Sequence, residues 1–330
     1  MSRKKVLSGA VAFTITGIFM WLALRKVEFA ALAEALRAAR LVWLLPMVGI
    51  VYLDLLVRAV RWRVLLSRTR PEPAPVWDLY KLEAIGLAVN NVLLLRLGEL
   101  ARAGLAARRL GIPGAAALAS VAIERALDVA ALLTIFVLAT RLAPGIAPAQ
   151  VVQGALLLLA GAITALIVLA LAEGSLAPGG LIERALRPWP KVHRLVEQLA
   201  LGAAVLRSPS AAAYAVALSL LLWTVDAALY WTAAYALDLG GIMDYPRAVL
   251  TLSWAGAVSA IPAAPGAIGT FEAFVASILR TFGAAPEVAL AYALMTHMIM
   301  YLLVTVTGLA FLWRDGVSLA KLGEDAERGA

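Results

Sequence analysis

Two carboxylates and an arginine interrupt a long apolar stretch at Glu124–Asp128, where the sequence reads ERALD. Glu124 and Asp128 are one helical turn apart, so they share a helix face, with Arg125 beside them. An ionised group at membrane depth costs about 2.5–3.5 kcal/mol and therefore needs a partner or water. Two interpretations follow: a salt-bridge cluster that holds helices together, or a polar path that contacts a lipid headgroup. Further acids at Glu99 and Glu272 favour the polar path.

Arginines occur at the end of an earlier apolar stretch, RAVRWR (58–63). A guanidinium binds phosphate oxygens in a bidentate manner, which makes Arg58 and Arg61 candidates for headgroup contact. The alternative is that these side chains extend to the membrane surface and Trp62 lies in an aromatic belt. For Arg63 the surface position is the predicted one.

A polar interruption follows in NNVLLLRLGELAR (90–102). Asn90 and Asn91 either satisfy backbone groups that a broken helix leaves free, or contact a ligand directly. The charged residues that follow are predicted to lie on related helix faces. A local ion pair would account for two of them, whereas all three together indicate a wider network. These residues are Arg96, Glu99 and Arg102.

The stretch AIPAAPGAIGTFEAF (260–274) contains two prolines, two glycines and one glutamate. Proline removes a helix donor and glycine allows positive φ, so the pattern predicts a helix that stops and a second helix that returns. Thr270 is the predicted N-cap of the returning helix, which puts Glu272 in the first turn, where the helix dipole favours a carboxylate. The residues assigned to the two interruptions are Gly98, Pro262, Pro265, Gly266 and Gly269.

His297 and Tyr301 lie one turn apart in the last long apolar stretch and are candidate path residues. His297 is interpreted as a hydrogen-bonded interior residue or as a proton carrier. The chain has no cysteine and two histidines, neither with sequence neighbours at metal-ligand spacing, so no metal site and no cofactor are expected. The sequence has no phosphate-cradling, zinc-protease or serine-hydrolase motif, so we expect no enzyme activity.

The composition indicates what positions these residues. Hydrophobic residues make up 63% of the 330 residues and charged residues only 15%, whereas soluble domains have about 45–50% apolar residues. The mean hydropathy is +0.88. The sequence therefore predicts an all-α polytopic membrane protein. The net charge of +8 does not predict nucleic-acid binding, because no separate soluble domain carries it.

A helix needs about 20 apolar residues to cross the hydrocarbon, and six segments meet this requirement: 6–24, 41–66, 114–139, 150–172, 211–239 and 286–313. Segments 27–40 and 181–207 are amphipathic and are predicted to lie along the membrane surface. Segments 76–110 and 245–283 are apolar but interrupted, and are predicted to enter and leave on one side as re-entrant hairpins.

The distribution of basic residues predicts the orientation. With both termini in the cytoplasm, the cytoplasmic regions hold 21 of the 29 Lys and Arg residues. Cytoplasmic loops of membrane proteins carry such an excess, so both termini are predicted to lie inside. The expected location is the cytoplasmic (inner) membrane of a bacterium or archaeon.

The chain contains a weak internal repeat. One constant offset places Glu99 on Glu272 and Pro113 on Pro286, and each unit has a span, a broken segment and a span. Three crossings separate the units, so one is inverted, as in transporters that alternate access around a midplane site. The predicted organisation is a single transmembrane domain. It consists of an anchor and interfacial helix (6–40), repeat 1 (41–139), a connecting region (140–210), inverted repeat 2 (211–313) and a tail (314–330).

In order and spacing, the motifs RAVRW, NNVLLLRLGELARA, ERALD and IPAAPGAIGTFEAF resemble the lysylphosphatidylglycerol synthase transmembrane-region family, a flippase-like domain family. The resemblance extends from about Leu7 to Trp313. Leu94 stands where this family usually has proline, and Ala267 stands where a second glycine is common.

The resemblance implies lipid movement between leaflets, with membrane lipids as partners. The synthase domain of multidomain relatives is absent from this sequence, so the candidate lipids are an anionic or modified phospholipid, a hopanoid or a glycolipid. A lipid-synthesis enzyme is a further candidate partner. Two alternatives remain: a non-transporting scaffold for lipid-modifying enzymes, and a carrier for a small solute or ion.

Overall fold

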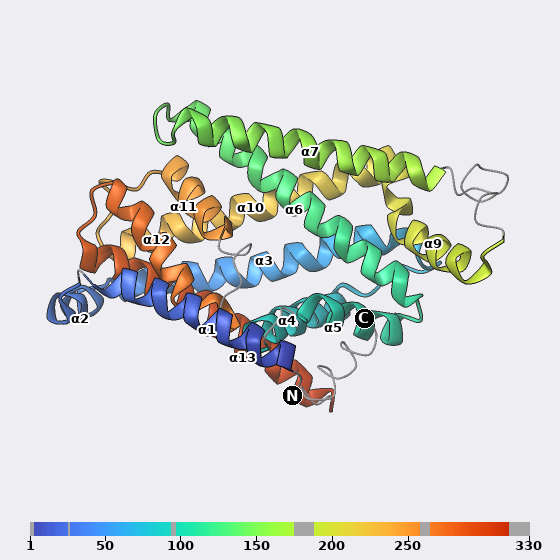
Figure 1. The fold of residues 1–330 in the computed structure, drawn as a ribbon, viewed down its shortest axis with the longest axis horizontal. Helices are drawn as coiled ribbons and strands as arrows, with labels where there is room; N and C mark the ends of the chain where they lie inside the picture. The colour runs from blue at the N-terminus through green and yellow to red at the C-terminus, as the bar shows by residue number, and fades with distance from the viewer. Residues whose placement is uncertain (1–2, 26, 94–96, 175–187, 258–264, 317–330) are drawn as a thin grey trace.

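The computed structural model describes residues 3–25, 27–93, 97–174, 188–257 and 265–316, and within these ranges every regular element is a helix (Figure 1). The long helices are α1 (Arg3–Leu24), α3 (Leu44–Leu65), α6 (Gly114–Leu142), α7 (Ala149–Gly174), α10 (Pro209–Ala236) and α13 (Pro286–Arg314). The shorter helices are α2 (Phe29–Arg37), α4 (Val76–Val92), α5 (Gly98–Leu110), α9 (Pro190–Ala203), α11 (Tyr245–Ala257) and α12 (Thr270–Thr281). Single 3-10 turns are η1 (Leu41–Trp43), η2 (Leu66–Arg68), η4 (Ala204–Arg207) and η6 (Pro265–Ala267).

Within the described residues, four helices are long and apolar enough to cross a membrane. They are α3 with its flanking turns (Leu41–Arg68), the first 20 residues of α7 (Ala149–Val168), α10 and α13. α6 has 29 residues but carries Glu124, Arg125 and Asp128 near its middle, which lowers its apolar content. The protein is therefore an all-helical, multi-pass membrane protein, as the sequence predicts.

Two pairs of short helices replace continuous helices where the sequence predicts interruptions. α4 and α5 occupy the first interrupted segment, and α11, η6 and α12 occupy the second. In Figure 1 the α11–α12 pair lies toward the left end of the long axis, and the α4–α5 pair lies nearer the middle, along the lower edge. We call the connection between α4 and α5 the first break and that between α11 and α12 the second break. Arg96 in the first and Pro262 in the second lie outside the described residues.

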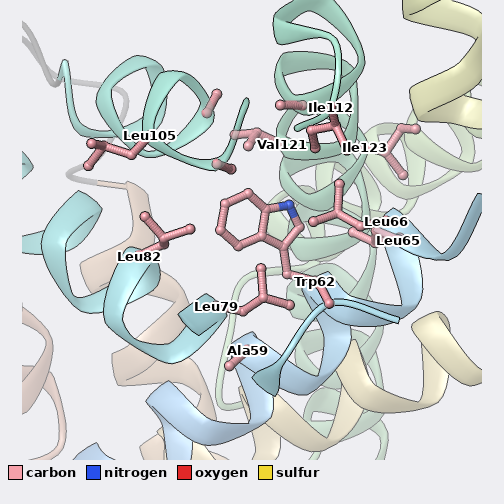
Figure 2. Packing of buried hydrophobic residues seen from close by; sticks show 14 of the residues in the cluster. Ala59, Trp62, Leu65, Leu66, Leu79, Leu82, Leu105, Ile112, Val121 and Ile123 are labelled. Carbon is pink, nitrogen blue, oxygen red and sulfur yellow. The ribbon is translucent and has the colours of Figure 1, made fainter. Parts of the chain in front are cut away.

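The first half of the chain, through α6, and the second half, from α10 onward, each contribute most of one apolar core. The first core joins α3, α4, α5 and α6 around Trp62 (Figure 2) and includes residues of α10 and α13. The second core joins α10, α11, α12 and α13 around Tyr230 and Tyr292 and includes residues of α3 and α6. Trp62 is fully buried, and its indole N–H donates to the Ser120 hydroxyl at 3.0 Å. Its interpretation as an aromatic-belt residue is therefore wrong: a buried indole needs one hydrogen-bond partner, and Ser120 supplies it.

Small residues allow the helices around the first break to approach closely. A Cβ at Gly98 would lie 1.9 Å from the carbonyl oxygen of Gly86, so α4 and α5 are in backbone contact there. A Cβ at Gly308 would lie 2.2 Å from the carbonyl oxygen of Ala84, so α13 packs equally closely on α4. Glycine at such contacts is typical of helix packing in membranes.

Candidate functional site

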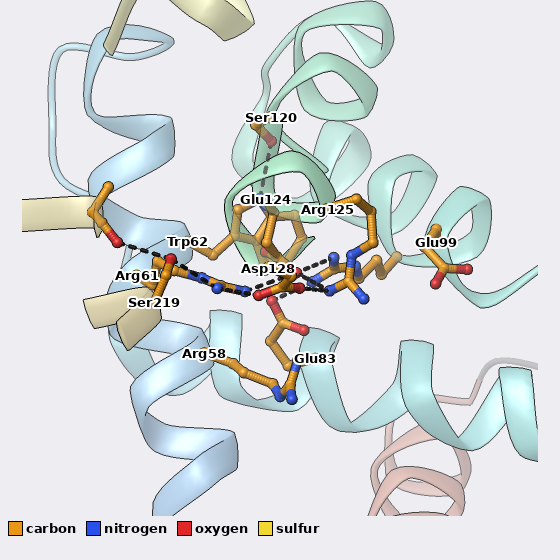
Figure 3. Close-up of polar contacts among 12 residues, drawn as sticks. Arg58, Arg61, Trp62, Glu83, Glu99, Ser120, Glu124, Arg125, Asp128 and Ser219 are labelled. Atoms are coloured by element: carbon orange, nitrogen blue, oxygen red, sulfur yellow. Dashed lines mark hydrogen bonds and ion pairs between the residues drawn. The ribbon is translucent and has the colours of Figure 1, made fainter. Parts of the chain in front are cut away.

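The charged residues of the first half form one buried arginine–carboxylate network, shown in Figure 3. Its centre is Glu124, which has no exposed surface. The Glu124 carboxylate accepts a hydrogen bond from Arg102 Nη2 at 2.6 Å and lies 3.3 Å from Arg61 Nη2. The neighbouring Arg125 donates to the same oxygen of Glu124 at 2.5 Å. Three guanidinium groups therefore converge on one carboxylate.

Asp128 is the second carboxylate of the network. Arg61 Nη1 donates to Asp128 Oδ1 at 2.5 Å, and Arg125 Nη2 lies 3.0 Å from Asp128 Oδ2. Two residues of α10 complete the contacts: Ser219 Oγ accepts from Arg61 at 3.1 Å, and Trp223 Nε1 donates to Asp128 at 3.2 Å. The predicted i, i+4 pair on α6 therefore faces α3 and α10.

Glu83 is the third carboxylate, and the sequence interpretation missed it. It lies on α4, is fully buried and pairs with Arg102, whose guanidinium also stacks over the Trp62 ring at 4.8 Å. The sequence feature that could have identified Glu83 is its place as an acidic residue directly before the apolar run AIGLAV. The three arginines and three carboxylates of the network therefore carry equal and opposite formal charges. Buried charges are tolerated in a protein when they are paired in this way.

Arg58 forms a separate pair one turn away on α3. Its Nε donates to Asp54 Oδ2 at 2.7 Å, and its Nη2 lies 3.9 Å from Asp226 Oδ2 on α10. The interpretation that Arg58 and Arg61 extend to the membrane surface is therefore wrong, because both side chains are buried against acidic residues. Arg63 is exposed, as predicted.

Arg125 differs from the other arginines of the network because its side chain is 41% exposed. It lies near the middle of a 29-residue helix and keeps two carboxylate contacts. Its remaining surface is available to an anionic group outside the helix bundle. The network thus contains one guanidinium that is paired and accessible at the same time.

Glu99 lies apart from the network (Figure 3). Its carboxylate accepts a hydrogen bond from Asn90 Nδ2 at 3.1 Å, and Asn90 Oδ1 accepts from the backbone N–H of Gly98 at 2.7 Å. Asn90 therefore satisfies a free backbone group at the start of α5, one of the two roles that the sequence allowed. Asn91 donates to Thr305 Oγ1 on α13 at 2.8 Å.

At the second break, Glu272 is buried and holds the start of α12. Its Oε2 accepts from the backbone N–H of Gly269 at 2.6 Å, and its Oε1 lies 2.6 Å from His297 Nδ1. Gly266 and Gly269 have φ of +67° and +85°, in the left-handed region that glycine adopts without strain. The assignment of Thr270 as N-cap is wrong by one residue: Gly269 is the cap, and the Thr270 hydroxyl donates to the Ala267 carbonyl instead. Pro265 begins η6.

A cavity of about 240 Å³ lies where α4 meets the second break. Its polar lining comes from Asn91, His297 and Tyr301, and backbone of Gly266 forms part of its wall. A Cβ at Gly266 would lie 2.3 Å from the Tyr301 ring, so the break is pressed against α13. His297 also stacks on Phe271, with ring centroids 4.2 Å apart.

Of the predicted site residues within the described ranges, the structure joins Arg61, Arg102, Glu124, Arg125 and Asp128 in the network. It groups Asn91, Glu272, His297 and Tyr301 around the cavity or its wall. Two hydrogen-bonded pairs lie outside these two groups, Glu99 with Asn90 and Arg58 with Asp54. In the described part of the chain, no three His, Asp or Glu side chains come together in a way that could hold a metal ion.

The comparison with known families shows which family the chain belongs to. The sequence profile of the lysylphosphatidylglycerol synthase TM region matches residues 8–308. The chain belongs to this family. The match extends from α1 into α13 and includes both breaks and the network, which confirms the resemblance seen in the motifs. No curated protein sequence and no solved structure matches the chain.

Proposed function

We propose that this protein is a flippase- or scramblase-like transporter, which moves a phospholipid or other envelope lipid between leaflets of the cytoplasmic membrane. The observation that carries the proposal is the polar-lined cavity beside His297, where the second break meets α4. Broken backbone at membrane depth is tolerated only where protein buries it or where it lines a cavity. A transport path needs such a cavity, whereas a purely structural bundle does not.

The proposed architecture has six spans and two re-entrant hairpins in two inverted repeats (41–139 and 211–313), with both termini in the cytoplasm. Three features support it. The short helix pairs lie at different positions along the bundle, and the start of α1 and the end of α13 lie on the same side in Figure 1. The basic residues favour the same orientation.

In the proposed mechanism, a lipid headgroup enters the polar region while its acyl chains stay in the bilayer. Arg125 is the network residue that contacts the headgroup, because it alone in the network is partly exposed. Arg61 and Arg102 hold the surrounding helices through Glu124 and Asp128. The opening and closing of the two breaks would then expose the cavity to each side in turn. No cofactor and no chemical step is involved.

The complete pairing of Arg61 and Arg102 favours one other function, a non-transporting scaffold in which the network only holds helices together. Lipid transport separates the two functions. The purified protein, reconstituted in liposomes with headgroup-labelled lipids of several classes, is expected to move at least one class. Glu99→Gln and Glu272→Gln should each slow this movement, and Glu197→Gln, on the exposed face of α9, should not.

If the wild-type protein moves no headgroup class, the transporter proposal fails and the scaffold is favoured. If it moves lipid and both variants match the wild type, the assignment of Glu99 and Glu272 to the path fails instead.

A further inference from the structure

A second cavity lies between α1 and α12 and shares no lining residue with the cavity beside His297. Its volume is about 270 Å³, and its wall is formed by Phe19, Trp254 and Phe274, with two arginines, Arg25 and Arg280. The Phe19 and Phe274 rings lie 5.5 Å apart, and the Trp254 and Phe274 rings 6.1 Å apart. The cavity thus has an aromatic side and a cationic side.

The two arginines differ from those of the network. Within the described residues, no carboxylate lies within salt-bridge distance of Arg25 or Arg280, whereas Arg58, Arg61, Arg102 and Arg125 are all paired. The Arg25 guanidinium lies over the Trp21 ring at 5.2 Å. Arg280 uses only Nε, which donates to the Ala276 carbonyl at 3.2 Å, so both of its Nη groups remain available.

Both arginines are located at helix ends. Arg25 directly follows α1, and Arg280 lies in the last turn of α12. At a membrane boundary this location suits a cation that meets a headgroup while its apolar neighbours meet acyl chains. Ile18 is more than half exposed and lies one turn before Leu22, which lines the cavity, so it extends the apolar surface along α1.

We propose that this groove binds an anionic phospholipid, with its phosphate between Arg25 and Arg280 and an acyl chain along the aromatic side. A guanidinium pair suits phosphate oxygens. The volume lies just below that of typical ligand pockets, about 300–1,000 Å³, so it accommodates a headgroup and the first part of one acyl chain, while the rest of the lipid stays in the membrane. This inference rests on the proposed transport function, for which it names the lipid class and a lateral entry point between α1 and α12.

The test measures equilibrium binding and needs no transport. The full-length protein in detergent is titrated with dioleoyl phosphatidylglycerol, and bound lipid is counted by native mass spectrometry. The double variant Arg25→Gln/Arg280→Gln is expected to weaken binding by roughly tenfold or more, as for the loss of charge-assisted hydrogen bonds. The matched control Arg37→Gln, on the exposed face of nearby α2, should stay within about twofold of the wild type.

Two further arms define the ligand. Dioleoylglycerol, which lacks phosphate, should not bind, and soluble glycerol phosphate at equal concentration should not displace phosphatidylglycerol. Ser277→Trp, which keeps both arginines but fills the groove that Ser277 lines, should also weaken binding. Size-exclusion profiles show whether each variant is folded, and Ser277→Trp tests the site if the double variant is not.

Unchanged phosphatidylglycerol binding in the folded double variant or in Ser277→Trp would overturn the proposal. Displacement by glycerol phosphate would also overturn it, because the site would then be one for soluble phosphate. If both arginines are needed for binding but liposomes show no lipid movement, the transport function fails and the lipid site stands.

Discussion

The surroundings of the two breaks differ in how they neutralise buried carboxylates. Around the first break, Glu83, Glu124 and Asp128 are paired with three arginines from three helices. Around the second, Glu272 has one histidine and one backbone N–H. The first half is therefore held by charge across several helices, whereas the second is held by glycine geometry and local capping. Substitutions that remove a charge should destabilise the first break most, and substitutions that add side-chain volume should destabilise both breaks.

The largest effect is expected from Glu124→Gln. This change leaves three guanidinium groups with two carboxylates in a buried site, and the loss of one partner of a buried ion pair costs about 3–5 kcal/mol. Thermal unfolding in detergent should show a large fall in Tm. The control Asp78→Asn removes a surface acid paired with Lys81 and should cost less than about 1 kcal/mol. Equal Tm values for the two variants would show that the network does not hold the first half.

The next largest effect is expected from Gly98→Ala, because the added methyl group meets the Gly86 carbonyl and forces α4 and α5 apart. Overpacking of this kind costs about 1–3 kcal/mol. Gly104→Ala in the same helix has no neighbouring atom within 4 Å, and should be neutral or stabilising by up to about 1 kcal/mol. Chemical unfolding of both variants measures the difference. A destabilisation by Gly104→Ala as large as that by Gly98→Ala would contradict the close contact.

A smaller effect is expected from Glu272→Gln at the second break. The amide oxygen still accepts from Gly269, but a bond to a charged acceptor is about twice as strong as a neutral one, so the expected loss is about 1 kcal/mol. A double-mutant cycle with His297→Asn should give a non-zero coupling energy, because the two side chains lie 2.6 Å apart. Strict additivity would mean that the pair is not formed.

The smallest effect on stability is expected from Glu99→Gln, because a glutamine oxygen accepts the same hydrogen bond from Asn90. The free energy of unfolding should change by less than about 0.5 kcal/mol, while lipid movement in liposomes slows. This combination would assign the Glu99 charge to the path rather than to the fold. A loss of stability as large as that of Glu272→Gln would place Glu99 among the structural residues instead.

The sequence predicted the order and type of the elements because apolar runs, prolines and glycines act locally. Proline at residue 286 and glycine at 114 begin α13 and α6 within a residue of the predicted starts. The grouping of Glu124 with Asp128 also follows from helical spacing alone.

The partners of the site residues could not be predicted, because they depend on how separate helices pack. Nothing local to α4 relates Glu83 to Arg102, and nothing local to α10 relates Trp223 to Asp128. The sequence allowed two locations for Arg58 and Arg61, the membrane surface and the protein interior, because a basic residue near the end of an apolar run suits both. Burial against acids from other helices decided the outcome.

The polar residues of α10 have a consequence for movement between the two halves. Ser219, Trp223 and Asp226 recur at spacings of four and three, so they form one stripe along the helix. Although α10 belongs to the proposed second repeat, the stripe contacts Arg61, Asp128 and Arg58 of the proposed first repeat. A slide of α10 by one turn, about 5.4 Å, would separate all three contacts together. Any such motion therefore breaks the three contacts together and not one at a time.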